Sequence, residues 1–159
     1  MDTLTQYGIS QVGMVVADLD ATMQQYHATF GWGPWNIYEY RPPYLEHLTL
    51  RGKPAEFTWM GAEAHAGGTW IEVLQPLEGD SPLKDWLTQH GDGVHHLGYE
   101  AADEETARRF HKSFEDQGMT ELVSAYINGM YFYYMDASPL LIEVWAGSAD
   151  ALTPARTYP

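Results

Sequence analysis

The stretch that decides the fold is Gly91-Asp92-Gly93-Val94-His95-His96-Leu97-Gly98-Tyr99-Glu100. Its glycines end one segment, and an apolar run that opens with two adjacent histidines begins directly after them. Because side chains alternate between the two faces of a strand, such a strand can direct one imidazole into a cavity. The same pattern occurs near the start of the chain, where Gln11-Val12-Gly13 matches His96-Leu97-Gly98. This similarity predicts a duplicated unit.

The predicted elements follow the same order in both halves of the chain. Each half reads as a strand, a helix and three further strands, which predicts an α+β fold of two tandem βαβββ units. The first unit is expected at residues 8–76, with a loop inserted at about 41–52 and a strand at 53–62, and the second at 93–147. We expect residues 77–92 to be a linker with a short helix and 148–159 to be a loosely packed C-terminal tail. The chain is therefore expected to be a single domain made of two repeats.

The charge of the chain excludes several classes of partner. Its formal net charge is −14, with eight Lys and Arg against 22 Asp and Glu, so neither nucleic acid nor an anionic membrane is an expected partner. The chain has no cysteine, which excludes disulfides and thiolate chemistry. No secretory leader and no apolar run of membrane-spanning length is visible, which predicts a cytoplasmic protein.

Aromatic residues make up 14% of the chain. This content suits either a core rich in rings or an aromatic-walled pocket for an apolar or aromatic small molecule. By strand alternation, Trp70 shares a face with Glu72 and Trp145 shares one with Glu143, so these two tryptophans are the expected substrate-binding wall. His47, in the insertion, is either an exposed loop residue or a substrate-binding lid.

One glutamate stands inside the last apolar strand of each unit, Glu72 in Ile-Glu-Val-Leu and Glu143 in Ile-Glu-Val-Trp. A carboxylate among apolar neighbours is costly to bury without a partner, so each glutamate either faces solvent or belongs to a site. Their matching positions, together with Gln11 and His96 at a second matching pair, favour a site. If the units pack about a pseudo-twofold axis, these four side chains converge and suit a divalent ion such as Zn²⁺, Ni²⁺, Co²⁺ or Mn²⁺.

Five segments carry a resemblance to a known superfamily: Gln11-Val-Gly-Met-Val-Val-Ala-Asp-Leu-Asp, Ile71-Glu-Val-Leu-Gln-Pro-Leu, Ser81-Pro-Leu, Gly93-Val-His-His-Leu-Gly and Ile142-Glu-Val. Over about residues 8–147, the chain resembles the vicinal oxygen chelate superfamily of glyoxalase I, methylmalonyl-CoA epimerases, extradiol dioxygenases and bleomycin-resistance proteins. The segments around Ser81 and His95-His96 are most similar to the methylmalonyl-CoA epimerase branch. The resemblance implies paired βαβββ units that form a curved mixed sheet around a central metal cavity.

Carried over residue by residue, the resemblance implies metal ligands at Gln11, Glu72, His96 and Glu143. The first position is commonly His in the epimerases and dioxygenases, so Gln11 departs from their pattern and argues against an extradiol dioxygenase iron site. Eukaryotic-type glyoxalase I resembles the Gln, Glu, His, Glu set. Its surrounding sequence is not found here, so glutathione thioester chemistry is not favoured.

The resemblance implies a metal-dependent isomerase, epimerase or lyase that moves a proton next to a carbonyl through a metal-bound enediolate. The substrate is expected to be bulky and apolar or aromatic. Glu143 is the first choice for the catalytic base and Glu72 the second, whereas His95 is expected to be structural. The alternative function is non-catalytic binding of a small molecule, as in the sequestering bleomycin-resistance proteins. Exposed strand edges favour a homodimer.

Overall fold

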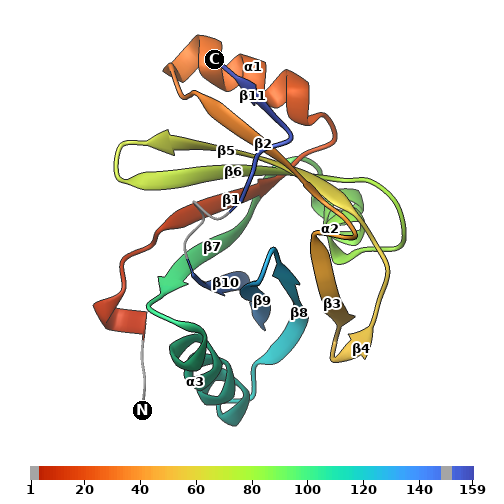
Figure 1. Ribbon diagram of the computed structural model, residues 1–159, viewed down its shortest axis with the longest axis vertical. Helices are drawn as coiled ribbons and strands as arrows, with labels where there is room; N and C mark the ends of the chain where they lie inside the picture. The colour runs from red at the N-terminus through yellow and green to blue at the C-terminus, as the bar shows by residue number, and fades with distance from the viewer. Residues whose placement is uncertain (1–3, 148–151) are drawn as a thin grey trace. The chain divides into compact units, whose positions relative to one another are not determined.

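The computed structural model describes residues 4–147 and 152–159 and contains two compact units (Figure 1). Unit 1 contains Pro42–Glu56 and His96–Leu152, together with the N-terminal residues up to Ser10. Unit 2 contains Gln11–Arg41, Phe57–His95 and Thr153–Pro159. Each unit has its own helix, strands and hydrophobic core, so each can position side chains by its own packing.

Unit 2 holds the first βαβββ motif. Its elements are β1 (Gln11–Val15), α1 (Leu19–Phe30), β2 (Trp35–Tyr40), β5 (Trp59–Ala66), β6 (Thr69–Pro76), α2 (Pro82–His90) and β11 (Arg156–Tyr158). The strands lie in the order β11-β2-β5-β6-β1. β1 runs parallel to β6, and the other neighbours are antiparallel. The first and last strands of the motif therefore lie side by side.

Unit 1 repeats this motif. Its elements are η1 (Leu4–Gln6), β3 (Leu45–Leu50), β4 (Lys53–Pro54), β7 (Gly93–Ala101, which begins in unit 2), α3 (Glu104–Asp116), β8 (Thr120–Ile127), β9 (Met130–Ala137) and β10 (Leu140–Ala146). The strands lie in the order β7-β10-β9-β8-β3-β4, and β7 runs parallel to β10. The predicted α+β class and the two βαβββ motifs are confirmed.

Local sequence signals set the ends of the helices. The Asp18 side chain accepts a hydrogen bond from the Ala21 N–H at the start of α1, and Gly31 ends that helix at φ 71°. Asp103 caps α3 in the same way through the Thr106 N–H. Asn128 and Gly129 both have positive φ values, as a two-residue hairpin turn between β8 and β9 requires.

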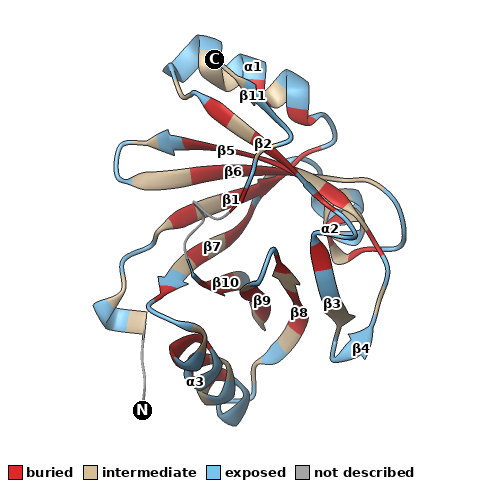
Figure 2. Ribbon diagram, in the orientation of Figure 1, coloured by how far each residue is buried: buried red, intermediate tan, exposed pale blue. Residues whose placement is uncertain are grey.

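The core of unit 2 lies between α1 and one face of its sheet. Leu19 and Met23 of α1 pack there with strand residues such as Met14, Ile71 and Val73. The strands carry most of the buried residues (Figure 2). Because side chains alternate along a strand, the neighbours of these core residues project from the opposite face. By this alternation, Gln11 and Glu72, described below, lie on that opposite face.

The core of unit 1 is built in the same way from α3. Phe110 and Phe114 of the helix pack with Tyr133, Ile142 and Val144 of the sheet. Even-numbered residues of β10 face the helix, so the odd-numbered residues of that strand face away from it. Among the described residues, no helix combines the length and the apolar character that crossing a lipid bilayer needs.

Three expected elements differ from the structure. The insertion at 41–52 is not a loop, because β3 pairs with β8 and β4 pairs with β3. The strand expected at 53–62 lies later, as β5, because its hairpin with β6 turns at Gly67. The tail expected to be loosely packed forms β11 on β2 at residues 156–158, while residues 148–151 lie outside the described residues.

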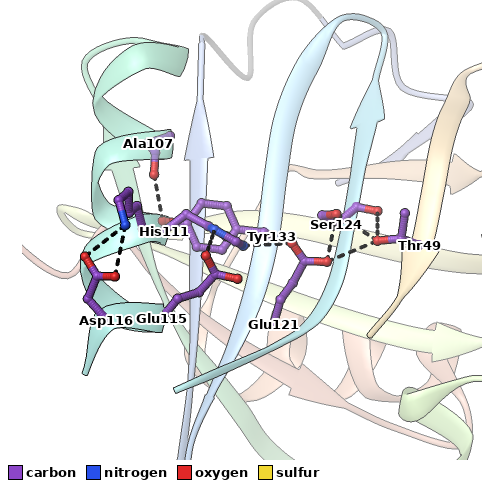
Figure 3. A network of polar contacts seen from close by, with 9 residues as sticks. Thr49, Ala107, His111, Glu115, Asp116, Glu121, Ser124 and Tyr133 are labelled. Carbon is purple, nitrogen blue, oxygen red and sulfur yellow. Dashed lines mark hydrogen bonds and ion pairs between the residues drawn. The ribbon is translucent and has the colours of Figure 1, made fainter. Parts of the chain in front are cut away.

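A polar network ties β3 to α3 within unit 1 (Figure 3). Its centre is Glu121 on β8, whose Oε2 lies 2.8 Å from His111 Nε2. Thr49 of β3 and Ser124 donate hydroxyl hydrogen bonds to Glu121 Oε1, both at 3.1 Å. Tyr133 packs its ring edge-on against His111 and donates its hydroxyl to the Ala107 carbonyl. The inserted strand is thus held by side-chain hydrogen bonds as well as by its strand pairing.

The network predicts an acid-dependent loss of stability. The hydrogen bond from His111 is the main cause that holds the pKa of Glu121 below its ordinary value of 4.5, and burial opposes it. A lowered folded-state pKa contributes stability that is present above pH 4.5 and is lost as the pH falls through the folded-state pKa. We expect Glu121→Gln to lower the free energy of unfolding by about 1–3 kcal/mol near pH 7 and by much less at about pH 3. Urea unfolding at the two pH values measures this difference.

Glu115 provides the matched control, because it also faces His111. Its Oε2 lies 3.5 Å from His111 Nδ1, but its side chain is 53% exposed. An exposed pair contributes little, so Glu115→Gln is expected to cost less than about 0.5 kcal/mol. A loss in Glu121→Gln that is the same at both pH values would show that the charge of Glu121 is not the source.

Candidate functional site

In unit 2, Gln11 and Glu72 are placed by the parallel pairing of β1 and β6. Gln11 is opposite Trp70, and Gly13 is opposite Glu72. Both polar side chains are buried, Gln11 at 6% exposure and Glu72 at 4%. The structure therefore places an amide and a carboxylate on adjacent strands, on the sheet face that α1 does not cover.

In unit 1, His96 and Glu143 are placed by the parallel pairing of β7 and β10. His96 is opposite Leu141, and Gly98 is opposite Glu143. The two functional groups are in contact, with His96 Nε2 3.0 Å from Glu143 Oε2. His96 is fully buried, and Glu143 is nearly so.

The two registers are the same. In each unit, the polar residue of the first strand stands two positions before the glycine that faces the glutamate of the last strand. Gln11 is therefore the counterpart of His96, and Glu72 is the counterpart of Glu143. These are the equivalences expected from the sequence repeat, and the strand pairing of each unit now supports them separately.

The partner of Glu143 is a buried imidazole with an aromatic neighbour. Tyr134 stands opposite Glu143 in the β9–β10 pairing, and its ring meets the His96 ring edge-on at 4.9 Å between centroids. A buried carboxylate needs such a partner, because burial without one is costly. An imidazole nitrogen and a carboxylate oxygen 3.0 Å apart in a buried place are donors that borderline divalent metals prefer. These residues therefore fit a divalent ion.

Two further residues stand close to Glu72. The Tyr40 hydroxyl donates to Glu72 Oε1 at 3.5 Å. Glu63 of β5 is directly opposite Glu72, and it is 7% exposed. The sequence reasoning missed both. Glu63 could have been found by counting back from the hairpin at Gly67, because a two-residue turn sets the register of its strands.

The remaining predicted site residues fall in different places. Trp145 is buried on the sheet face that carries Glu143. Trp70 is half-buried, and its ring centroid lies 3.5 Å from that of His65. His95 packs against the Trp86 ring of α2. His47 is exposed, and its ring lies edge-on to Tyr126 at 5.9 Å.

The contacts of Tyr126 locate His47 within unit 1. The Tyr126 hydroxyl bonds to Glu104 and Arg108 of α3, so Tyr126 lies on the helix-covered face of the sheet. Glu143 and His96 project from the other face. The structure therefore does not bring His47 to this pair of residues.

Comparison with known proteins places the chain in a family. The family model described as Glyoxalase/Bleomycin resistance protein/Dioxygenase superfamily matches residues 10–134. No curated protein shows a significant match to the sequence.

Solved structures share the fold. A hypothetical protein from Bacillus halodurans C-125 has a TM-score of 0.65 at 16% identity, covering 94% of this chain and 100% of its own. Methylmalonyl-CoA epimerase from Mycobacterium tuberculosis has a TM-score of 0.63 at 20% identity, covering 94% and 95%. A variant of the Streptomyces coelicolor epimerase, in complex with 2-nitronate-propionyl-CoA, has a TM-score of 0.59 at 22% identity, covering 89% and 95%. At these identities the likeness shows the fold, and the family model shows the family. The chain belongs to the Glyoxalase/Bleomycin resistance protein/Dioxygenase superfamily.

Proposed function

We propose that this protein is a divalent-metal-dependent isomerase or epimerase that moves a proton next to a carbonyl group. The observation that carries the proposal is the repeated polar pair. Each unit presents a buried glutamate and a buried amide or imidazole in the same strand register. Such pairs are costly in apolar strands, so their repetition is best explained by a shared task. A lyase reaction that begins by removing the same proton would use the same residues.

In the proposed site, Gln11, Glu72, His96 and Glu143 hold the metal ion. The donor set is one imidazole nitrogen, two carboxylates and one amide oxygen, which suits Zn²⁺, Ni²⁺, Co²⁺ or Mn²⁺. When bound, a divalent ion makes a neighbouring C–H bond more acidic, because it stabilises the negative charge that develops on a carbonyl oxygen.

Glu143 is the proposed base. Its carboxylate takes the proton next to the carbonyl, and the electron pair of the C–H bond moves toward the carbonyl oxygen. Glu72, its counterpart in the repeat, starts protonated and gives its proton to the carbon, so the substrate and product differ in configuration or in the position of the hydrogen. Glu143 is then protonated and Glu72 ionised, and proton exchange with solvent restores the starting state. His96 Nε2 lies 3.0 Å from Glu143 Oε2, so both groups are close enough to serve one ion. A pair of carboxylates related by the repeat suits a reaction that removes and returns a proton on different sides.

The substrate is proposed to be a bulky carbonyl compound with an apolar or aromatic part. Support comes from the aromatic residues that share a sheet face with the glutamates, Trp70 with Glu72 and Trp145 with Glu143. The structures similar in fold include methylmalonyl-CoA epimerases. The CoA thioester in their name has an acidic C–H bond next to a carbonyl. The homodimeric state and the cytoplasmic location of the protein stay predictions from the sequence.

Metal content and proton exchange test the proposal together. Protein purified without chelators is expected to carry about one divalent ion per chain, measured by plasma mass spectrometry. In D₂O, a panel of carbonyl compounds is screened by NMR for exchange of the proton next to the carbonyl. Exchange is expected to stop when the metal is removed by a chelator and to return with Co²⁺ or Mn²⁺. Protein that neither carries metal nor takes it up on titration would contradict the proposal, and compound binding without exchange would indicate a sequestering protein instead.

A further inference from the structure

The ring of Tyr40 lies directly over the backbone of Gly61 in unit 2. A Cβ atom on Gly61 would stand 2.8 Å from Tyr40 Cε2, closer than real Cβ contacts allow, and 3.2 Å from Leu74 Cδ2, which is tight. Gly61 does not have a positive φ, so the backbone conformation does not explain a glycine there. The absence of a side chain at this position instead leaves room for the tyrosine ring.

A second aromatic ring holds Tyr40 in place. Trp59 stands opposite Tyr40 in the β2–β5 pairing, and the two rings stack at 4.9 Å between centroids with an angle of 8°. Both side chains are buried. The ring is therefore held between strand backbone and indole. Its hydroxyl then reaches Glu72 Oε1 at 3.5 Å.

Unit 1 lacks this arrangement at the equivalent positions. The counterpart of Gly61 is Phe132, because Gly61 is opposite Leu74 and Phe132 is opposite Trp145, each two positions beyond the glutamate. The counterpart of Tyr40 is Ile127, opposite Met130 at the start of β9. A side chain fills the space that Gly61 leaves open, and an apolar residue replaces the phenol.

Glu72 therefore has a phenol contact that Ile127, the equivalent residue of unit 1, cannot give to Glu143. Glu143 is held by the imidazole of His96, whereas Glu72 is contacted by the phenol of Tyr40. In unit 2 the counterpart of His96 is Gln11, an amide. Tyr40 and Gly61 therefore occur together in unit 2. This is the unit that has Gln11, rather than a histidine, at the proposed ligand position of its first strand.

We propose that Tyr40 is a positioning residue for Glu72 and that Gly61 is required because the Tyr40 ring occupies the space above it. The hydroxyl holds Oε1, which limits rotation of the carboxylate that would bind the metal ion. The inference rests on the proposed function, because it takes Glu72 as a metal ligand. Hydrogen bonds to metal ligands typically change metal affinity by about 10–100-fold. The contact is long for a hydroxyl–carboxylate hydrogen bond, so we expect the lower end of that range.

Cobalt titration of the metal-free protein tests the inference. Tyr40→Phe keeps the stacked ring and removes only the hydroxyl. It is expected to weaken Co²⁺ binding about 10-fold and to alter the visible absorption of bound Co²⁺. The thermal unfolding of the metal-free variant is expected to stay close to that of the wild type. A purely structural role for Tyr40 would leave the Co²⁺ affinity and spectrum unchanged.

Gly61→Ala tests the same contact from the other side. The added methyl group would displace the Tyr40 ring, so Co²⁺ affinity is expected to fall in the wild-type background. In a Tyr40→Ala background the methyl group has no ring to displace, so Gly61→Ala is expected to add no further loss. If Tyr40→Phe should fail to fold, the Co²⁺ affinity of Gly61→Ala alone still tests the contact, because that variant keeps the phenol.

Tyr26→Phe is the matched control in unit 2. The Tyr26 hydroxyl contacts Met14 Sδ at 3.7 Å, on the side of the sheet that α1 covers. Its removal is expected to leave Co²⁺ binding unchanged. Wild-type Co²⁺ affinity and spectrum in Tyr40→Phe would overturn the positioning role and leave the proposed function standing. A wild-type protein that binds no Co²⁺ would overturn the proposed function itself.

Discussion

His96→Ala is expected to reduce the affinity for a divalent ion by more than roughly 10–100-fold. That range is the typical loss when a residue that only hydrogen-bonds to a metal ligand is removed. His96 is fully buried, and its Nε2 stands 3.0 Å from Glu143 Oε2. The substitution removes the imidazole donor of the proposed set and leaves the buried Glu143 carboxylate without its imidazole partner. Isothermal titration of the metal-free protein with Zn²⁺ or Co²⁺ measures the loss, and proton exchange is expected to disappear with it.

The neighbouring histidine supplies the control. His95 is also buried, but it faces the Trp86 ring of α2. His95→Ala is therefore expected to reduce stability without changing metal affinity. His96→Gln copies the residue that unit 2 carries at the equivalent position, Gln11, and is expected to keep part of the affinity because an amide oxygen replaces the imidazole nitrogen. Unchanged metal binding in His96→Ala would remove His96 from the proposed site.

Glu143→Gln is expected to slow proton exchange by about 10²–10⁴-fold, the usual contribution of a general base. The amide has the shape of the carboxylate but cannot accept the proton. Metal affinity is expected to fall much less than exchange, because the amide oxygen can still act as a ligand. Exchange in D₂O at saturating metal, followed by NMR, separates the two effects.

Comparison with Glu72→Gln identifies the base. If Glu143 removes the proton, exchange falls further in Glu143→Gln than in Glu72→Gln, and the reverse order would assign the base to Glu72. Glu121→Gln is the control carboxylate in unit 1. Glu121 bonds to His111 of α3, so it lies on the helix-covered side of the sheet, and its substitution is expected to change stability but not exchange.

The local parts of the fold could be predicted because their causes are local. Apolar periodicity predicts the two repeat helices, and their starts are predicted at Asp18 or Asp20 and at Asp103. The structure has the caps at Asp18 and Asp103. Asn128-Gly129 predicts a two-residue hairpin turn, and β8 and β9 pair across it. Each of these signals acts within a few residues, so the sequence contains it directly.

The inserted segment was missed for the opposite reason. Arg41-Pro42-Pro43 reads as the end of a strand followed by a loop, yet residues 45–50 form β3. That strand pairs with β8, more than 70 positions later in the chain, and the bond from Thr49 to Glu121 strengthens the contact. Because the partner of β3 is so distant in sequence, the residues of β3 by themselves do not indicate that they form a strand.

The sequence by itself determined which polar residues interrupt the apolar strands and which face of each strand they share. Gln11, Glu72, His96 and Glu143 could be named from the repeat alone, since side chains alternate strictly along a strand. Their partners were decided by the tertiary structure. Strand register brings the imidazole of His96 to Glu143 within unit 1, and the pairing of three strands brings the phenol of Tyr40 to Glu72 within unit 2. Register is a property of two segments together, so no single stretch of sequence specifies it.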